Sequence, residues 1–341
     1  VEDFRGTMGK SKIFINAELG LGSDSLLKNQ NNHISLKASK LDFDELFFYE
    51  KPDTLYAASP EEHEKGFNIY DLAFPNLKVD LDIKDLNYHL YRIKNFESSV
   101  RIQPNHYIYL DTLSMDIADG NVKMSGYFNG SNPKLIYFSP DIILTKVNMD
   151  KLFVKFENFG QDYLVSEHIH GKLSGRLWGE MHMHKDMVPI IDDSDIHLDF
   201  NVLSGKLENF GPMEYLAEYF ADKNVAKVLF DTLHNHIDMT NGALNIPKMK
   251  INTSLGFVEM SGVQNSDFSY EYYLRVPWKM VTKAGASKLF RKKKGELVNP
   301  DEEDEIVYAQ EGKKIRYVNI QIIGDLEDYQ IKLKKAKESI F

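Results

Sequence analysis

The sequence lacks several features that common classes of protein require. It has no cysteine, which excludes disulfides, thiolate catalysis and cysteine-based metal sites. It has no run of eighteen apolar residues, so no transmembrane helix is expected. A net charge of −10, without a sustained basic face, argues against a nucleic-acid partner.

Sequence motifs typical of catalytic sites are missing as well. The chain has no G-x-S-x-G segment, no glycine-rich phosphate loop followed by Lys-Ser or Lys-Thr, and no partnered acid and base. Acidic clusters such as 192–193 and 301–305 lie in expected loops, where charge runs are usually solvated. We therefore expect no enzymatic activity, no cofactor and no bound metal. The chain begins at Val1 rather than methionine, which indicates a piece of a longer protein with its signal or anchor upstream.

What the sequence does contain is a regular alternation of polar and apolar residues. From His168 to His184 the even positions are mostly polar, and the odd positions from Ile169 to Met183 are apolar or glycine. A strict period of two predicts one extended strand with an apolar face and a polar face. At about 3.3 Å per residue, this strand would run on the order of 55 Å. A strand of that length predicts a long, strongly coiled sheet rather than a compact core.

Three glycines, Gly171, Gly175 and Gly179, interrupt the apolar face of this stretch. Glycine inside a strand costs stability, so sheet curvature, a bulge or room for an apolar guest must account for them. We expect that they bend the sheet and leave open space beside the apolar side chains. Five methionines are each compatible with an ordinary core and together suit a promiscuous apolar surface: Met181, Met183, Met239, Met249 and Met260.

Alternation recurs along most of the chain. Further strands are expected at 13–19, 79–90, 113–117, 122–128, 142–149, 196–202, 237–244, 248–254, 256–262, 268–276, 317–323 and 329–333. We expect a tight turn at 119–121, and a β-bulge after Val202, where the apolar parity shifts to Leu203. Helices are expected at 150–156, 212–220, 225–233 and 278–290. The predicted fold class is mostly β, a long, strongly coiled antiparallel β-sheet that forms an elongated apolar groove, with a few short helices.

The long stretch carries two pairs of histidines at a spacing that zinc could use: His168 with His170, and His182 with His184. On one unbroken strand the two pairs lie roughly 45 Å apart and cannot share an ion. A hairpin near Arg176 would bring them together, but the unbroken alternation argues against that turn. We interpret these histidines as solvated surface residues, and likewise His234 and His236 near a helix end.

The segment 203–216 resembles the G-x-L-x-x-F-x-P-hydrophobic segment of AsmA-like C-terminal domains. The stretch 237–254 resembles the strands that follow in that family, and Gly262, 268–270 and 274–276 come in the expected order. The positions that carry the resemblance are Gly205, Leu207, Phe210, Pro212, Ile246, Pro247, Met249 and Gly262.

The resemblance divides the chain into four parts. These are an N-terminal part of the groove (1–110), an AsmA-like C-terminal domain (111–290), a charged mobile loop (291–312), and a final strand pair with a lysine-rich tail (313–341). The loop and the tail depart from the family pattern.

AsmA-like proteins belong with the TamB and bridge-like lipid-transfer proteins of diderm bacteria. The resemblance implies a periplasmic β-groove that binds and conducts phospholipid acyl chains between the inner and outer membranes, in a parent protein anchored to the inner membrane. It implies phospholipid or another acyl lipid as ligand, and protein partners at either membrane. The residues expected to line the groove are Ile169, Leu173, Leu177, Met181, Met183, Ile196, Leu198, Phe200, Val202, Tyr270 and Tyr272.

Two other functions are to be weighed. One is an assembly or scaffolding role for outer-membrane proteins, in which exposed strand edges pair with client strands and no lipid is conducted. The other is a hydrolase or metalloenzyme that uses the histidines. A transmembrane barrel also alternates, but it needs an unbroken apolar outer band, and the expected helices and charged loops interrupt such a band.

Overall fold

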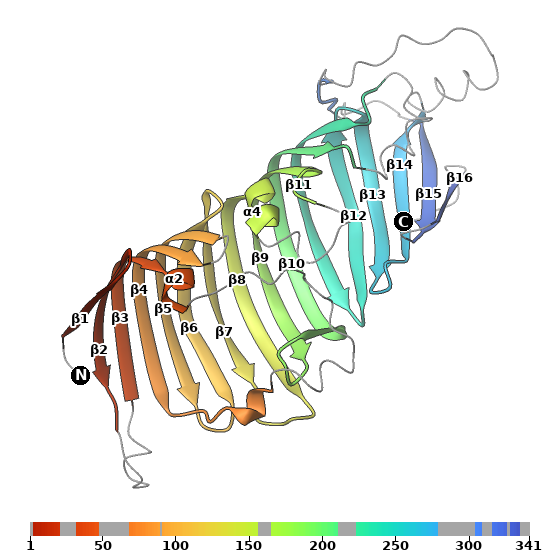
Figure 1. The fold of residues 1–341 in the computed structure, drawn as a ribbon. Coiled ribbons are helices and arrows are strands. Elements are labelled where there is room, and N and C mark those ends of the chain that lie inside the picture. The colour runs from red at the N-terminus through yellow and green to blue at the C-terminus, as the bar shows by residue number, and fades with distance from the viewer. Residues whose placement is uncertain are drawn as a thin grey trace. The chain divides into compact units, whose positions relative to one another are not determined.

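The computed structural model describes residues 3–20, 32–47, 68–88, 91–155, 165–210, 223–278, 304–308, 316–325 and 328–334. Within these ranges the chain forms one open sheet of sixteen strands, in which each strand lies beside its neighbours in sequence (Figure 1). The predicted mostly β fold class is confirmed.

The chain divides into two compact units. Unit 1 consists of Val1–Val147 and Arg176–Ile196, and unit 2 of Asn148–Gly175 and His197–Phe341. The strands of unit 1 are β1 (Phe4–Met8), β2 (Ser11–Glu18), β3 (Asn32–Asp42), β4 (Leu77–Tyr88), β5 (Tyr91–Gln103), β6 (Tyr107–Ile117), β7 (Gly120–Asn129) and β8 (Ile136–Asn148). Strands β9 (Ile169–Met183) and β10 (Pro189–Glu208) contribute residues to both units. The other strands of unit 2 are β11 (Lys227–Thr240), β12 (Ala243–Thr253), β13 (Gly256–Asn265), β14 (Tyr270–Pro277), β15 (Tyr317–Gly324) and β16 (Tyr329–Lys334).

From β1 to β8, every pair of neighbouring strands is antiparallel except one. Strands β3 and β4 run parallel, with Leu36 opposite Leu81. A parallel pair needs a crossover, and the chain between them includes α2 (Phe43–Phe47) and the 3-10 turn η1 (Ile69–Asp71). Ile69 of this turn is buried against the apolar side chains at one end of β7 and β8. The turn η1 therefore covers one end of the apolar side of unit 1.

Two short α-helices are present among the described residues, α2 and α4 (Met149–Lys155). The prediction of a helix at 150–156 is confirmed by α4. Its Met149 and Phe153 pack against Phe200 and Val202 of β10, on the apolar side of unit 2. Of the helix predicted at 278–290, only Trp278 lies in the described ranges, and the helix predicted at 212–220 lies outside them.

The helix predicted at 225–233 is wrong, because residues from Lys227 onward belong to β11. Val228 and Phe230 are two residues apart and both buried, as in a strand. Asp231 and Thr232 are both exposed, so the next apolar side chain that packs is Leu233, three residues after Phe230. A gap of three residues between apolar positions is typical of a helix, and this explains the wrong prediction.

The strand predicted at 237–244 is wrong as a single element. It contains a two-residue turn at Asn241 and Gly242, which joins β11 to β12 with Thr240 opposite Ala243. Both turn residues have positive φ (51° and 69°), as a type I′ hairpin turn requires.

The turn predicted at 119–121 exists, but it lies one residue earlier. Ala118 and Asp119 have positive φ, of 50° and 60°, and Ile117 pairs with Gly120. The hairpin of β6 and β7 is thus closed by the same kind of two-residue turn as that of β11 and β12.

The long strand is confirmed as β9, which runs for 15 residues without a turn at Arg176. Its glycines do not leave open space, contrary to the expectation. A Cβ on Gly175 would lie 2.3 Å from the Asp199 carbonyl oxygen, and one on Gly179 would lie 2.1 Å from that of Asp195. The backbone of β10 occupies the room where those side chains would be, so the glycines permit a close approach of two strands.

Candidate apolar binding face

The strands of unit 1 place apolar side chains of one parity opposite one another from strand to strand. One such row crosses β3 to β8 through directly paired residues: Leu36, Leu81, Ser98, Leu113, Met124 and Ile142. A second row begins beside it: Ile34, Val79, Val100 and Leu110. Because side chains two apart lie on the same side of a strand, both rows lie on one surface, here called the apolar face of unit 1.

Bulges keep the apolar face continuous. The register between β5 and β6 shifts after Ser99, and Asp111 and Thr112 of β6 are both exposed. Leu110 and Leu113 therefore both stay on the apolar face, although they are three residues apart. The extra residue is absorbed on the polar side, as in a β-bulge.

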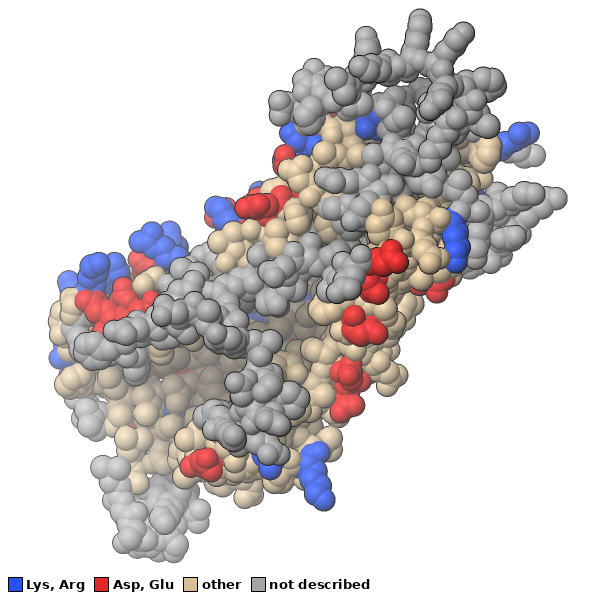
Figure 2. Space-filling view, turned by 45° about the vertical axis from the view of Figure 1, so that its right-hand side comes forward, with Lys and Arg blue, Asp and Glu red and all other residues tan. Residues whose placement is uncertain are grey.

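Among the described residues, the side chains at the two ends of this face are buried and most of those in its middle are partly buried. At one end Ile69, Phe128 and Ile136 form a buried cluster, which Phe138 and Met183 join. At the other end Ala38, Ile83, Leu86 and Ile93 are buried. Between them the two rows are only partly buried, apart from Ser98. Figure 2 shows a hollowed, largely uncharged surface over this part of the chain, with charged side chains gathered at its margins.

The opposite face of the same strands is polar. Arg101 makes two hydrogen bonds of 2.6 Å to Asp111, and Arg176 makes two of 2.8 Å to Asp141. Hydrogen bonds from these guanidinium groups hold the pKa of Asp111 and that of Asp141 below the usual range. One side of the sheet in unit 1 is therefore charged and solvated and the other is apolar.

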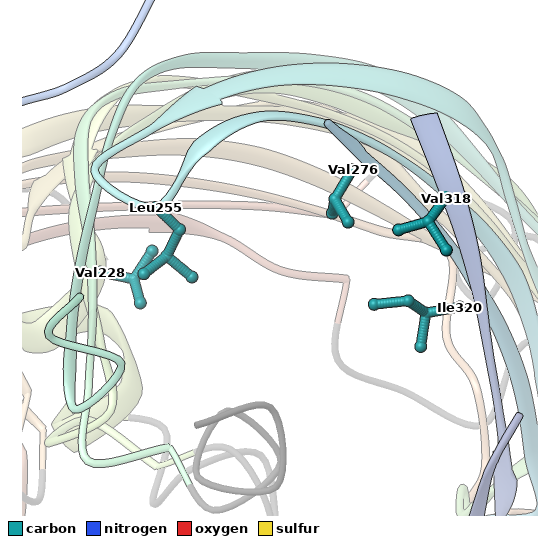
Figure 3. Close-up of a cluster of buried hydrophobic side chains, with 5 residues drawn as sticks. All are labelled: Val228, Leu255, Val276, Val318 and Ile320. Carbon is teal, nitrogen blue, oxygen red and sulfur yellow. The ribbon is translucent and has the colours of Figure 1, made fainter. Parts of the chain in front are cut away.

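The sheet in unit 2 likewise has an apolar side and a polar side. Paired apolar residues cross β12 to β16 in a row: Met249, Met260, Leu274, Ile320 and Leu333. Next to it, Val228, Leu255, Val276, Val318 and Ile320 form a buried cluster, and Figure 3 shows their side chains on the concave side of the curved strands. Here the apolar side is more tightly packed than the middle of the face in unit 1.

The predicted lining residues fall into two groups. Ile196, Phe200, Val202 and Tyr270 are buried. The other seven are partly buried: Ile169, Leu173, Leu177, Met181, Met183, Leu198 and Tyr272. Five of the eleven belong to the cluster that includes α4: Ile169, Leu173, Leu198, Phe200 and Val202. These five lie on the predicted apolar side but are engaged in packing.

Tyr270 and Tyr272 stack with their ring centroids 5.0 Å apart on the apolar side of β14. A Cβ on Gly262 would lie 2.4 Å from the Tyr272 ring, so this glycine makes room for it. Burial raises the pKa of Tyr272 to about 12, and its hydroxyl lies 2.8 Å from the Gln264 Oε1.

The positions that carry the family resemblance are largely structural. Gly205 is buried and a Cβ there would meet the Phe230 ring, while Leu207 packs against two of the buried clusters. Phe210 lies beside the His168 ring with centroids 5.9 Å apart. Ile246 pairs with Gly262, Met249 is buried, and the Pro247 carbonyl accepts a hydrogen bond from Asn235. Pro212 lies outside the described residues.

The predicted bulge in β10 is present, but Leu203 is not on the apolar side. Ser204 has a φ of 51°, Leu203 is exposed, and the buried series passes from Val202 to Gly205.

The unbroken strand β9 holds the two histidine pairs apart. His184 is exposed, as predicted, whereas His168, His170 and His182 are partly buried. His170 lies 3.0 Å from an Asp150 oxygen, and His182 lies 3.0 Å from Glu180. His234 and His236 both lie on strand β11, so their predicted place near a helix end is wrong. His234 is exposed and His236 is partly buried. His236 belongs with His197 and Asp238 to a group whose ligand atoms lie within 4.8 Å of one another, a geometry that could hold a metal ion.

Sequence reasoning missed the apolar face of unit 1 as a candidate site. The signal was present in the alternation at 79–83, 113–117 and 122–128, but the lining prediction was confined to β9, β10 and β14. Alternation alone does not tell which apolar rows are covered by other parts of the chain. That depends on where α4 and η1 pack.

Within the described ranges, the helices are too short and too polar to span a membrane. Comparison of the chain with protein-family models, with curated proteins and with solved structures found no match.

Proposed function

We propose that this chain is a periplasmic groove protein whose apolar face binds phospholipid acyl chains and conducts them between the inner and outer membranes. The observation that carries the proposal is the pair of apolar rows whose side chains are mostly partly buried, one across β3 to β8 and one across β3 to β6, backed by a polar opposite face. A contiguous apolar face whose side chains stay partly exposed is typical of a surface that takes an apolar partner.

The chemistry of the face suits a hydrocarbon chain. Burial of acyl chain is worth about 0.8 kcal/mol per CH₂ and needs no directional contacts. Ser98 is the one polar residue in the row from Leu36 to Ile142, so the row offers little to fix a headgroup. We therefore infer weak headgroup selectivity and a ligand free to shift along the rows, as conduction requires.

The periplasmic location and the transfer between the two membranes rest on the resemblance to AsmA-like domains. In that reading the parent protein is anchored to the inner membrane, and this part of it lies in the periplasm. Partners at the two membranes would receive and deliver the lipid.

Two adjacent isoleucines of β8 provide a matched test. Ile142 is partly buried on the apolar face, opposite Met124, whereas Ile143 is 46% exposed on the polar face, opposite Lys123. Ile142→Glu places a carboxylate where an acyl chain would lie, and a charge desolvated by hydrocarbon costs several kcal/mol. Ile143→Glu makes the same chemical change on the other side of the same strand.

We expect protein purified from a diderm bacterium to carry phospholipid, detected by native mass spectrometry. Ile142→Glu should reduce the bound lipid about tenfold or more, and Ile143→Glu should leave it unchanged. Circular dichroism checks that both variants fold. Equal lipid loading of the two variants, or wild-type protein that is repeatedly empty, would contradict the proposal.

The scaffolding alternative predicts a different outcome. If strand-edge pairing were the function, the polarity of the face would not matter. Crosslinks from an end strand of the sheet, such as β1 or β16, to a client barrel strand would then be found instead.

A further inference from the structure

A second candidate site lies on the polar side of unit 2. His197 and Asp199 are two residues apart on β10, and His236 and Asp238 are two residues apart on β11. Residues at that spacing point to the same side of a strand. Here it is the side opposite Leu198 and Phe200, so this cluster is separate from the apolar surface.

Three potential ligands converge on one place. His197 Nδ1 lies 2.5 Å from Asp238 Oδ1, and His236 Nε2 lies 2.8 Å from the same oxygen. The two imidazole rings are stacked, with centroids 6.0 Å apart and planes at 15°. In a tetrahedral zinc site with bonds of about 2.0–2.1 Å, ligand atoms lie about 3.3 Å from one another. Ligand atoms that are all within 4.8 Å need only small side-chain adjustments to reach that geometry.

The fourth residue distinguishes this cluster from an ordinary surface ion pair. Asp199 Oδ1 lies 2.6 Å from His236 Nδ1. An imidazole that binds a metal through Nε2 must carry its proton on Nδ1, and a carboxylate at that proton fixes the tautomer and the ring orientation. Asp199 occupies the position of a carboxylate that accepts this Nδ1 proton without binding the metal itself. Elsewhere on the sheet, His33 with Asp80 and His182 with Glu180 supply one imidazole each.

We propose that His197, His236 and Asp238 bind a divalent transition-metal ion of the zinc class, and that Asp199 is a positioning residue that orients His236. The three ligand side chains are 30–39% exposed, so the ion can enter from solvent. Three protein ligands leave one coordination position for water or for a donor from another molecule. Because the ligands come from two neighbouring strands, the ion joins β10 to β11. This inference does not depend on lipid binding.

The test is calorimetric titration of the chelator-treated, dialysed chain with Zn²⁺. We expect one equivalent to bind to the wild-type protein and to His33→Ala, which removes a histidine from a single histidine–carboxylate pair. His197→Ala and His236→Ala should each lower the affinity more than about 100-fold, beyond the effect of an outer residue. Asp199→Asn should keep the stoichiometry and lower the affinity about 10–100-fold, and Asp199→Glu should restore part of it.

A second measurement needs no variant. Co²⁺ occupies zinc sites, and in a low-symmetry site with histidine ligands it absorbs visible light strongly. The wild-type protein should develop this absorption at one equivalent of Co²⁺ and lose it when Zn²⁺ is added. The absence of saturable binding to the wild-type protein, or binding by a folded His236→Ala variant equal to that of His33→Ala, would overturn the proposal.

Discussion

At the scale of single residues, a buried carboxylate shows how the polar side of the sheet is held. Glu259 is 7% exposed, and its Oε2 lies 3.0 Å from both Lys248 Nζ and Arg275 Nη1. Burial acts to raise the pKa of Glu259, but the two hydrogen-bonded cations outweigh it and the pKa lies below its usual value. The three residues come from β12, β13 and β14, so the ion pairs join three strands.

This arrangement makes stability depend on pH. A carboxyl group with a lowered folded-state pKa contributes stability above its unfolded-state pKa, and that contribution is lost as the pH falls through the folded-state pKa. We expect Glu259→Gln to destabilise unit 2 by about 1–3 kcal/mol at pH 7, because it leaves two cations without their partner.

The difference between Glu259→Gln and wild type should shrink once the pH falls below about 4.5. Urea unfolding at a series of pH values measures this difference in the free energy of unfolding. Glu97→Gln is the control, because Glu97 is 61% exposed and 3.4 Å from Lys84, and exposed pairs are worth at most about 1 kcal/mol. A pH-independent loss for Glu259→Gln would show that packing, not charge, holds this residue.

At the scale of elements, the close contact of β9 with β10 depends on glycine. The Gly175 position isolates this effect, because its φ lies outside the left-handed region and the obstacle to a side chain is the backbone of β10, at 2.3 Å from the Asp199 carbonyl oxygen and 3.2 Å from the Phe200 Cα. We expect Gly175→Ala to cost about 1–3 kcal/mol, the usual range for overpacking.

Lys172→Ala on the same strand is the matched control, because Lys172 is exposed. Its stability should stay within about 0.5 kcal/mol of wild type. Chemical denaturation of both variants gives the comparison. A Gly175→Ala variant as stable as Lys172→Ala would contradict the close contact of the two strands and favour the open-space interpretation of this glycine.

The elements that could be predicted from sequence are those with unbroken alternation. Strand β9 and the pair β15 and β16 follow directly from it, since one side of each is apolar. Strand β11 could not be recognised, because its buried series passes from Phe230 to Leu233 and reads like a helix. The Asn241-Gly242 turn carried a local signal, but the apolar residues on both sides of it obscured the reversal.

Sites made by several strands were harder to predict than the strands themselves. The pairing of β10 with β11 brings His197 to His236, and no spacing along the sequence contains that information. The parallel pairing of β3 with β4 likewise depends on the crossover through η1. The predicted lining residues of β9 and β10 are buried or partly buried, and the cover that α4 gives to several of them depends on tertiary packing.

At the scale of the whole molecule, we propose that the apolar side of the sheet accepts hydrocarbon. Each unit, taken by itself, separates apolar from polar side chains across its strands. In unit 1 the middle of that side is partly exposed, and in unit 2 it is more fully packed. We therefore expect acyl chains to be found first against β4 to β8.

The most direct test is a photo-crosslinking residue placed at Leu113 or at Thr112 of β6, in cells of a diderm bacterium with labelled phospholipid. Leu113 lies in the partly buried apolar row, and Thr112 is exposed on the polar side one residue away. The account predicts phospholipid crosslinked at position 113 and none at position 112. Equal labelling at both positions, or labelling only at 112, would contradict it.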